Sequence, residues 1–167
     1  MKALLFGALL AAAQPALAAA QETREWGLLV ERGEAFLGWA TPDSEDEAVG
    51  LSCVHGEGVI RLDVWADTTH GFDRAADGAW RNNAGAVEPW SGYAAVRSGA
   101  TREAVEVDAY QHPSGHGSNV RMRIPSESPL WEAFRGAGEL RVEVYDEVIA
   151  PAPAPQPLVK RFFAACG

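Results

Sequence analysis

Apolar and polar residues alternate along several short segments of this chain, and this alternation constrains the fold more than any other feature. In residues 59–66, Ile60, Leu62 and Val64 alternate with polar or aromatic residues. The same two-residue period recurs in segments 49–54, 105–110, 120–124 and 140–145. A period of two places successive side chains on opposite faces of a strand, and clean alternation is typical of antiparallel sheets with one buried and one solvated face. The sequence therefore predicts a mainly β fold, an antiparallel β-sandwich or barrel-like domain.

Short connections between apolar segments indicate hairpins. Segments 26–30 and 35–40 are joined by a charged connection with a glycine at residues 31–34. The glycine-containing residues 55–58 join two of the alternating segments and give the clearest hairpin in the chain. Residues 67–89 are rich in Gly, Ala, Asp and Asn, and we expect loops and one irregular strand there.

Two helices complete the predicted layout, a short internal helix and a C-terminal helix. Ser128 can cap the first helix, Pro129 suits its first turn, and Gly136 is expected to stop it. Residues 158–166 carry apolar residues at helical spacing and predict the second helix. The proline-rich residues 151–157 precede it and are expected to form an extended strap.

The first residues read as an export signal. Lys2 is followed by an apolar run over residues 3–13, a helix break at Gln14-Pro15, and small residues suited to cleavage near residue 20. The apolar run is too short to span a bilayer, so we expect no membrane anchor after its removal. We therefore expect a signal peptide over residues 1–20 and a single β-rich domain over residues 21–167, located in the periplasm or secreted.

The two cysteines of the chain are expected to form a disulfide. Cys53 shares the predicted inward face of its strand with Val49, and Cys166 shares one helical stripe with Val159 and Phe162. In an oxidising compartment such a pair usually bonds, and this bond would fasten the terminal helix to a core strand. The alternative is a redox-active thiol pair, which the absence of a short C-x-x-C spacing disfavours.

The charge of the chain excludes one class of partner. It carries 14 Lys and Arg against 23 Asp and Glu, a net charge of −9. Binding to a phosphate backbone needs clustered positive side chains, so we expect no nucleic-acid partner. The simpler interpretation of this net charge is that it keeps the protein soluble. The alternative is that the acidic residues form a docking face for a partner.

The strongest catalytic candidate is the pair His112 and His116. Two imidazoles four residues apart can share a metal on one face of a helix. Pro113 and Gly115 prevent a helix here, so the sequence favours a solvated hairpin loop, and we predict no catalytic residue, metal or cofactor. The acidic residues 43–47 lack the glycine and the spaced oxygen ligands of a calcium loop and are interpreted as a solvated turn.

A binding face has better support. Trp65, Tyr110 and Tyr145 fall on the polar side of predicted strands, next to charged residues that include Arg61 and Arg141. Aromatic rings interleaved with charges on a sheet can grip a sugar, a peptide or a protein. The alternative is that these rings only cover the sheet or pack beneath the proline-rich strap.

The layout resembles two families of small exported bacterial envelope proteins. The features that carry the resemblance are the signal sequence, Trp26 in an early strand, Leu51-Ser52-Cys53 in an apolar strand, and the closing residues 162–166, Phe-Phe-Ala-Ala-Cys. In outline the chain is similar to type VI secretion accessory proteins of the VasI kind and to invasion-associated locus B proteins. The resemblance implies a β-rich exported domain held by a disulfide, with an envelope or interaction role.

These observations favour a non-catalytic binding or interaction module of the bacterial envelope. Its expected partner is an envelope protein or a glycan. Two alternatives stay open: an exported enzyme inhibitor that plugs a cleft with residues 92–93 or 112–119, and a metal-dependent hydrolase.

Overall fold

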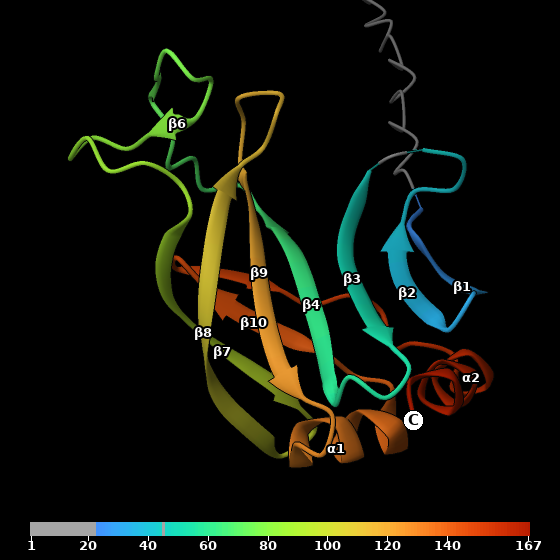
Figure 1. The fold of residues 1–167 in the computed structure, drawn as a ribbon. Coiled ribbons are helices and arrows are strands. Elements are labelled where there is room, and N and C mark those ends of the chain that lie inside the picture. The colour runs from blue at the N-terminus through green and yellow to red at the C-terminus, as the bar shows by residue number, and fades with distance from the viewer. Residues whose placement is uncertain (1–22, 45) are drawn as a thin grey trace, which may run out of the picture.

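A computed structural model describes residues 23–44 and 46–167, and it shows one large antiparallel sheet that curls into a half-barrel (Figure 1). The predicted mainly β class is confirmed, and of the two architectures considered the structure is the barrel-like one. The sheet has nine strands in the order β1-β2-β3-β4-β9-β8-β7-β10-β11. Their bounds are β1 Glu25–Glu31, β2 Glu34–Ala40, β3 Glu47–Val54, β4 Val59–Ala66, β7 Trp90–Ser98, β8 Thr101–Gln111, β9 Ser118–Pro125, β10 Arg141–Val144 and β11 Glu147–Ile149. The predicted signal peptide, residues 1–20, lies outside the described residues.

The alternating residues form the concave, buried face of this sheet. Leu37, Leu51, Leu62 and Met122 pair in register across β2, β3, β4 and β9, and none is more than 1% exposed. Burial of side chains of this size stabilises a fold by about 1.5–3 kcal/mol each. The opposite, convex face carries the charged and polar residues of the same strands. The sheet also curls until β11 returns to the end of β4.

Both helices lie at one end of the half-barrel (Figure 1). They are α1, Pro129–Ala137, and α2, Gln156–Cys166. Trp131 and Phe134 of α1 and Phe162 of α2 are fully buried, and Phe163 of α2 packs 6.3 Å from Phe134 between ring centroids. These aromatic side chains fill that end of the core.

The start of α1 is as predicted, and its end is not. Ser128 caps the helix by accepting a hydrogen bond from the backbone N–H of Leu130, and Pro129 occupies the first turn. The predicted stop at Gly136 is wrong, because the helix continues to Ala137. The left-handed residue that ends it is Gly138, with φ 71°, and its N–H donates to the Phe134 carbonyl.

The expected disulfide pair is present. The sulfurs of Cys53 on β3 and Cys166 on α2 lie 1.93 Å apart, and their Cα atoms are 5.6 Å apart. The helix begins at Gln156, inside the segment that was expected to be strap, because Pro157 falls in the first turn, where a proline costs no hydrogen bond.

The remaining part of the strap is extended and packed. Ala154 is buried and its N–H donates to the Gly138 carbonyl at 2.8 Å, while the Trp26 indole donates to the Ala152 carbonyl at 2.6 Å. The strap therefore ties the first strand to the end of α1.

Residues 67–89 hold the expected loops and a small two-stranded sheet, β5 Asp73–Arg74 and β6 Trp80–Arg81, which stands at the end of the half-barrel opposite the helices (Figure 1). Among the described residues, no helix is long and apolar enough to cross a membrane.

Candidate binding cleft

The structure brings part of the predicted aromatic face together on the convex side of the sheet. Trp65 of β4 and Tyr110 of β8 both pair with Asn119 of the intervening strand β9, so they lie in one row. The guanidinium of Arg121, in the next row, lies 5.1 Å from the Tyr110 ring centroid and its Nε donates to Asp63 Oδ1 at 2.9 Å. Tyr110 is therefore already engaged by a cation of its own chain.

The other predicted residues of that face are dispersed. Arg61 lies on the same face of β4, opposite Arg123 of β9. Arg141 lies on β10, near the far edge of the sheet. Tyr145 follows β10 in a left-handed conformation, φ 50°, and its ring packs edge-on against His70 with centroids 4.3 Å apart. Trp65, Tyr110 and Arg61 thus share one face, while Tyr145 and Arg141 lie elsewhere.

His112 and His116 lie in the turn between β8 and β9. The His112 ring stacks on Trp65 at 4.5 Å, and its Nδ1 is 2.7 Å from Ser114 Oγ. The backbone N–H of His116 donates to the same hydroxyl at 3.4 Å. Within residues 23–44 and 46–167, no three His, Cys, Asp or Glu side chains cluster closely enough to hold a metal ion.

His70 packs between the rings of Trp90 and Tyr145, close to the turn that joins β10 and β11. Burial lowers the pKa of its imidazole, and the carboxylate of Glu147 acts in the opposite direction without reversing the shift. Burial also raises the pKa of the Tyr145 phenol, and Asp108 adds to that shift. Both groups are therefore held neutral near pH 7, which suits packing more than proton transfer.

A cleft that the sequence patterns did not predict opens where β11 faces the ends of β2, β3 and β4. Its volume is about 370 Å³. Its charged and aromatic lining residues are Arg24, Asp46, Asp67, Glu147, Trp39 and Trp65. We call this space the seam cleft. It combines two indole rings and an arginine, residue types that are enriched at protein interfaces, with three carboxylates that can orient a polar or charged group.

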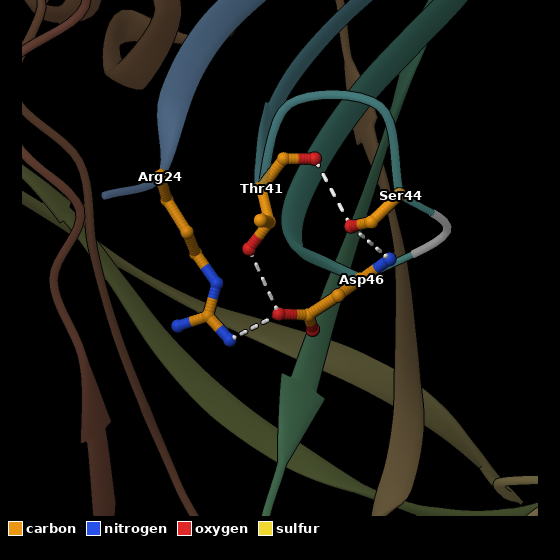
Figure 2. A network of polar contacts seen from close by, with 4 residues as sticks. All are labelled: Arg24, Thr41, Ser44 and Asp46. Atoms are coloured by element: carbon orange, nitrogen blue, oxygen red, sulfur yellow. Dashed lines mark hydrogen bonds and ion pairs between the residues drawn. The ribbon is translucent and has the colours of Figure 1, made fainter. Parts of the chain in front are cut away.

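One wall of the seam cleft is a polar network around Asp46, shown in Figure 2. Arg24 Nη2 donates to Asp46 Oδ2 at 2.8 Å, and Thr41 Oγ donates to the same oxygen at 3.2 Å. The Asp46 backbone N–H donates to Ser44 Oγ at 3.1 Å, and Ser44 Oγ donates to the Thr41 carbonyl at 3.0 Å. This turn therefore holds the Asp46 carboxylate in a defined position, and Glu47, which is predicted to lie in the solvated turn, is instead the half-buried first residue of β3.

Trp39 provides the aromatic surface beside this network. The residue continues the inward alternation of Ala35 and Leu37 along β2 and packs at the margin of the core. The guanidinium carbon of Arg24 lies 5.5 Å from the ring centroid, within cation–π range. The Trp39 Nε1–H is buried and has no acceptor in the described part of the chain. Five other buried side-chain polar atoms of the described residues share this state, among them Trp65 Nε1 and the core atom Trp131 Nε1, so it does not by itself mark a binding site.

The opposite wall is formed by Glu147 at the start of β11. Its carboxylate accepts hydrogen bonds from the backbone N–H groups of Asp67 at 2.8 Å and Thr68 at 2.7 Å, and from the Thr68 hydroxyl. The side chain of Asp67 is exposed beside it. Carboxylates thus outnumber cations around the cleft.

The sequence offered only a partial signal for this site. The alternation of Ala35, Leu37 and Trp39 indicates that Trp39 faces inward. Arg24 precedes the first strand and Glu147 follows a turn. Neither residue belongs to an alternating segment or a motif that would mark it as part of a site. Their meeting depends on the curl of the whole sheet.

Comparisons with known proteins give no relative. No protein-family model, no curated protein and no solved structure matches the chain.

Proposed function

We propose that this chain is an exported, non-catalytic binding module of the bacterial envelope, and that the seam cleft holds its partner. The observation that carries the proposal is the placement of the Trp39 ring beside a fixed Asp46 carboxylate in a cleft of about 370 Å³. Aromatic surfaces beside oriented polar groups are what a specific contact with a peptide or protein needs.

Two sequence features support the envelope location. Residues 1–20 have the pattern of an export signal, and Cys53 and Cys166 stand at bonding distance, as expected for a domain that matures in an oxidising compartment.

The polar geometry supports binding over catalysis. Among the described residues, the Ser114–His112 contact at 2.7 Å is the nearest approach to a nucleophile and base. It spans only two residues in an exposed turn, and the imidazole face is stacked on Trp65. A nucleophilic site also needs a third group that orients the base and donors for an oxyanion, and this turn supplies neither.

Site-directed photocrosslinking in the native envelope tests the proposal. Val148 lines the seam cleft and is 51% exposed, while Val87 is 40% exposed and lies in the loop after β6. A photoreactive amino acid at Val148 should capture a defined protein, and the same group at Val87 should not. The purified captured protein should then bind the wild-type chain and bind Asp46→Asn more weakly. The proposal is wrong if Val148 captures no protein, if both positions capture the same proteins equally, or if Asp46→Asn binds as the wild type does.

A further inference from the structure

We propose that the seam cleft recognises an arginine side chain in a basic segment of its protein partner, and that Arg24 occupies the position that this arginine takes. This inference rests on the proposed binding function and names the chemistry of the ligand. It also makes Arg24 an internal competitor of the partner.

The contacts of Arg24 are those of a bound guanidinium. Its planar group lies over the Trp39 ring at 5.5 Å and reaches Asp46 Oδ2 at 2.8 Å, so stacking and charge pairing act on the same side chain. Figure 2 shows the guanidinium directed at the carboxylate from the segment that leads into β1. An aromatic face beside a carboxylate suits arginine better than lysine, because the guanidinium is planar and weakly hydrated.

The interactions of Arg24 with Asp46 and Trp39 are weak enough for another guanidinium to replace it. Its side chain is 36% exposed and that of Asp46 is 33% exposed. Ion pairs with this exposure contribute little, because water and salt screen them. Arg24 also lies outside the ladder that pairs β1 with β2, so its withdrawal breaks no hydrogen bond of the sheet.

Charge decides between the possible ligands. Arg24 compensates Asp46, but Asp67 and Glu147 add further negative charge around the same cleft. The whole chain carries a net charge of −9, so a basic segment is attracted over a longer range and an acidic one is repelled. A neutral sugar would also have to displace Arg24 from the Trp39 ring, and it lacks the positive charge that the excess of carboxylates attracts.

The test is a titration of the full mature chain with small probes. The first probe is an acetylated and amidated pentapeptide with one arginine between glycines, and the second carries citrulline, a neutral isostere, in place of arginine. Binding is followed by NMR through the Trp39 indole N–H, assigned with Trp39→Phe. The arginine peptide should shift this signal in a saturable manner, more weakly at high salt, and the citrulline peptide should not.

Variants at position 24 test the competition. Arg24→Gln removes the competitor and its charge, and it should raise the affinity for the arginine peptide roughly three- to tenfold. Arg24→Lys keeps a cation and should stay closer to the wild type. Arg123→Gln removes an exposed positive charge on the convex face of β9 and should change the affinity by less than about twofold. Asp46→Asn should weaken binding in the Arg24→Gln background.

The outcomes separate this inference from the proposed function. Equal binding of the arginine and citrulline peptides, or no gain in Arg24→Gln beyond that in Arg123→Gln, overturns the arginine assignment. If no arginine peptide binds while Val148 still crosslinks a partner that depends on Asp46, the binding function stands and the ligand chemistry is wrong. If no arginine peptide binds and Val148 crosslinks no partner that depends on Asp46, the proposed function is wrong as well.

Discussion

At the scale of single residues, Glu47 is the most perturbed acid in the described part of the chain. Burial raises the pKa of its carboxyl from 4.5 to about 7, and the neighbouring carboxylate of Asp63 adds to the rise. The cause is local packing on the convex face. The Glu47 carboxyl lies over Gly50 beside the Phe36 ring, and a Cβ built on Gly50 would come within 2.1 Å of Glu47 Oε1. The glycine thus makes room for a carboxyl that water reaches only partly.

This shift predicts a pH-dependent stability. Between pH 4.5 and about 7 the folded state holds a proton that the unfolded chain releases, so the free energy of unfolding falls as pH rises through this window and levels off above it. Glu47→Gln removes that dependence. We expect it to be more stable than the wild type at pH 8 by about 1 kcal/mol, a value reduced for partial exposure, with little difference at pH 4.5. Urea denaturation at both pH values measures this.

Two further variants serve as controls for Glu47. Glu34→Gln removes an exposed carboxylate from β2 and should leave the pH dependence of the wild type in place. Gly50→Ala should push the flexible Glu47 carboxyl towards water and weaken the dependence without removing the charge. An unchanged pH dependence in Glu47→Gln would show that the carboxyl is not buried in this way.

At the scale of elements, the end of α1 is set by a close approach between two segments. Gly138 has φ 71°, and a Cβ at this position would lie 2.4 Å from the Ala154 carbonyl oxygen of the strap. The backbone of the strap and the helix end are joined by the hydrogen bond from Ala154 N–H to the Gly138 carbonyl. Only glycine satisfies both the left-handed conformation and this contact.

Paired glycine substitutions test this account of the helix end. Gly138→Ala should destabilise the protein by more than about 2 kcal/mol, because it adds left-handed strain to a clash with backbone that cannot turn aside. Gly136→Ala lies two residues earlier inside α1, where an added Cβ meets nothing within 4 Å, and it should stabilise the protein by roughly 0.5–1 kcal/mol. Thermal unfolding of both variants measures the contrast, and equal effects would contradict it.

The same two glycines show how far the sequence predicts elements. Ser128 and Pro129 specify the start of α1 locally, through a side-chain cap and a fixed φ, so the start was predictable. The choice between Gly136 and Gly138 as the stop depends on where Ala154 lies in space. No local pattern contains that contact.

At the scale of the whole molecule, the pattern of two predicted β3, β4, β8, β9 and β10, but it predicted neither β7 and β11 nor the curl of the sheet. Each alternating segment reports which of its own residues face inward, and those assignments lead to the row of Leu51, Leu62 and Met122, which Leu37 of β2 continues. The seam cleft needs Arg24 and Glu147 to meet. They belong to opposite edges of a nine-stranded sheet, and they approach only because the sheet bends back on itself. Sequence periodicity carries no information on that bend.

The link between Cys53 and Cys166 decides whether the last helix stays on this curled sheet. The bridge spans 113 residues of sequence, so it removes much of the freedom of the unfolded chain. Replacing both cysteines with serine should lower the free energy of unfolding by about 2–5 kcal/mol. The loss should be concentrated in α2, because its eleven residues are too few to form a stable helix alone and depend on Val159 and Phe162 remaining in the core. Hydrogen exchange should therefore show residues 156–166 losing protection before the strands, and urea denaturation should give the total change. Equal protection of α2 in the double variant and the wild type would mean that apolar packing alone retains the helix.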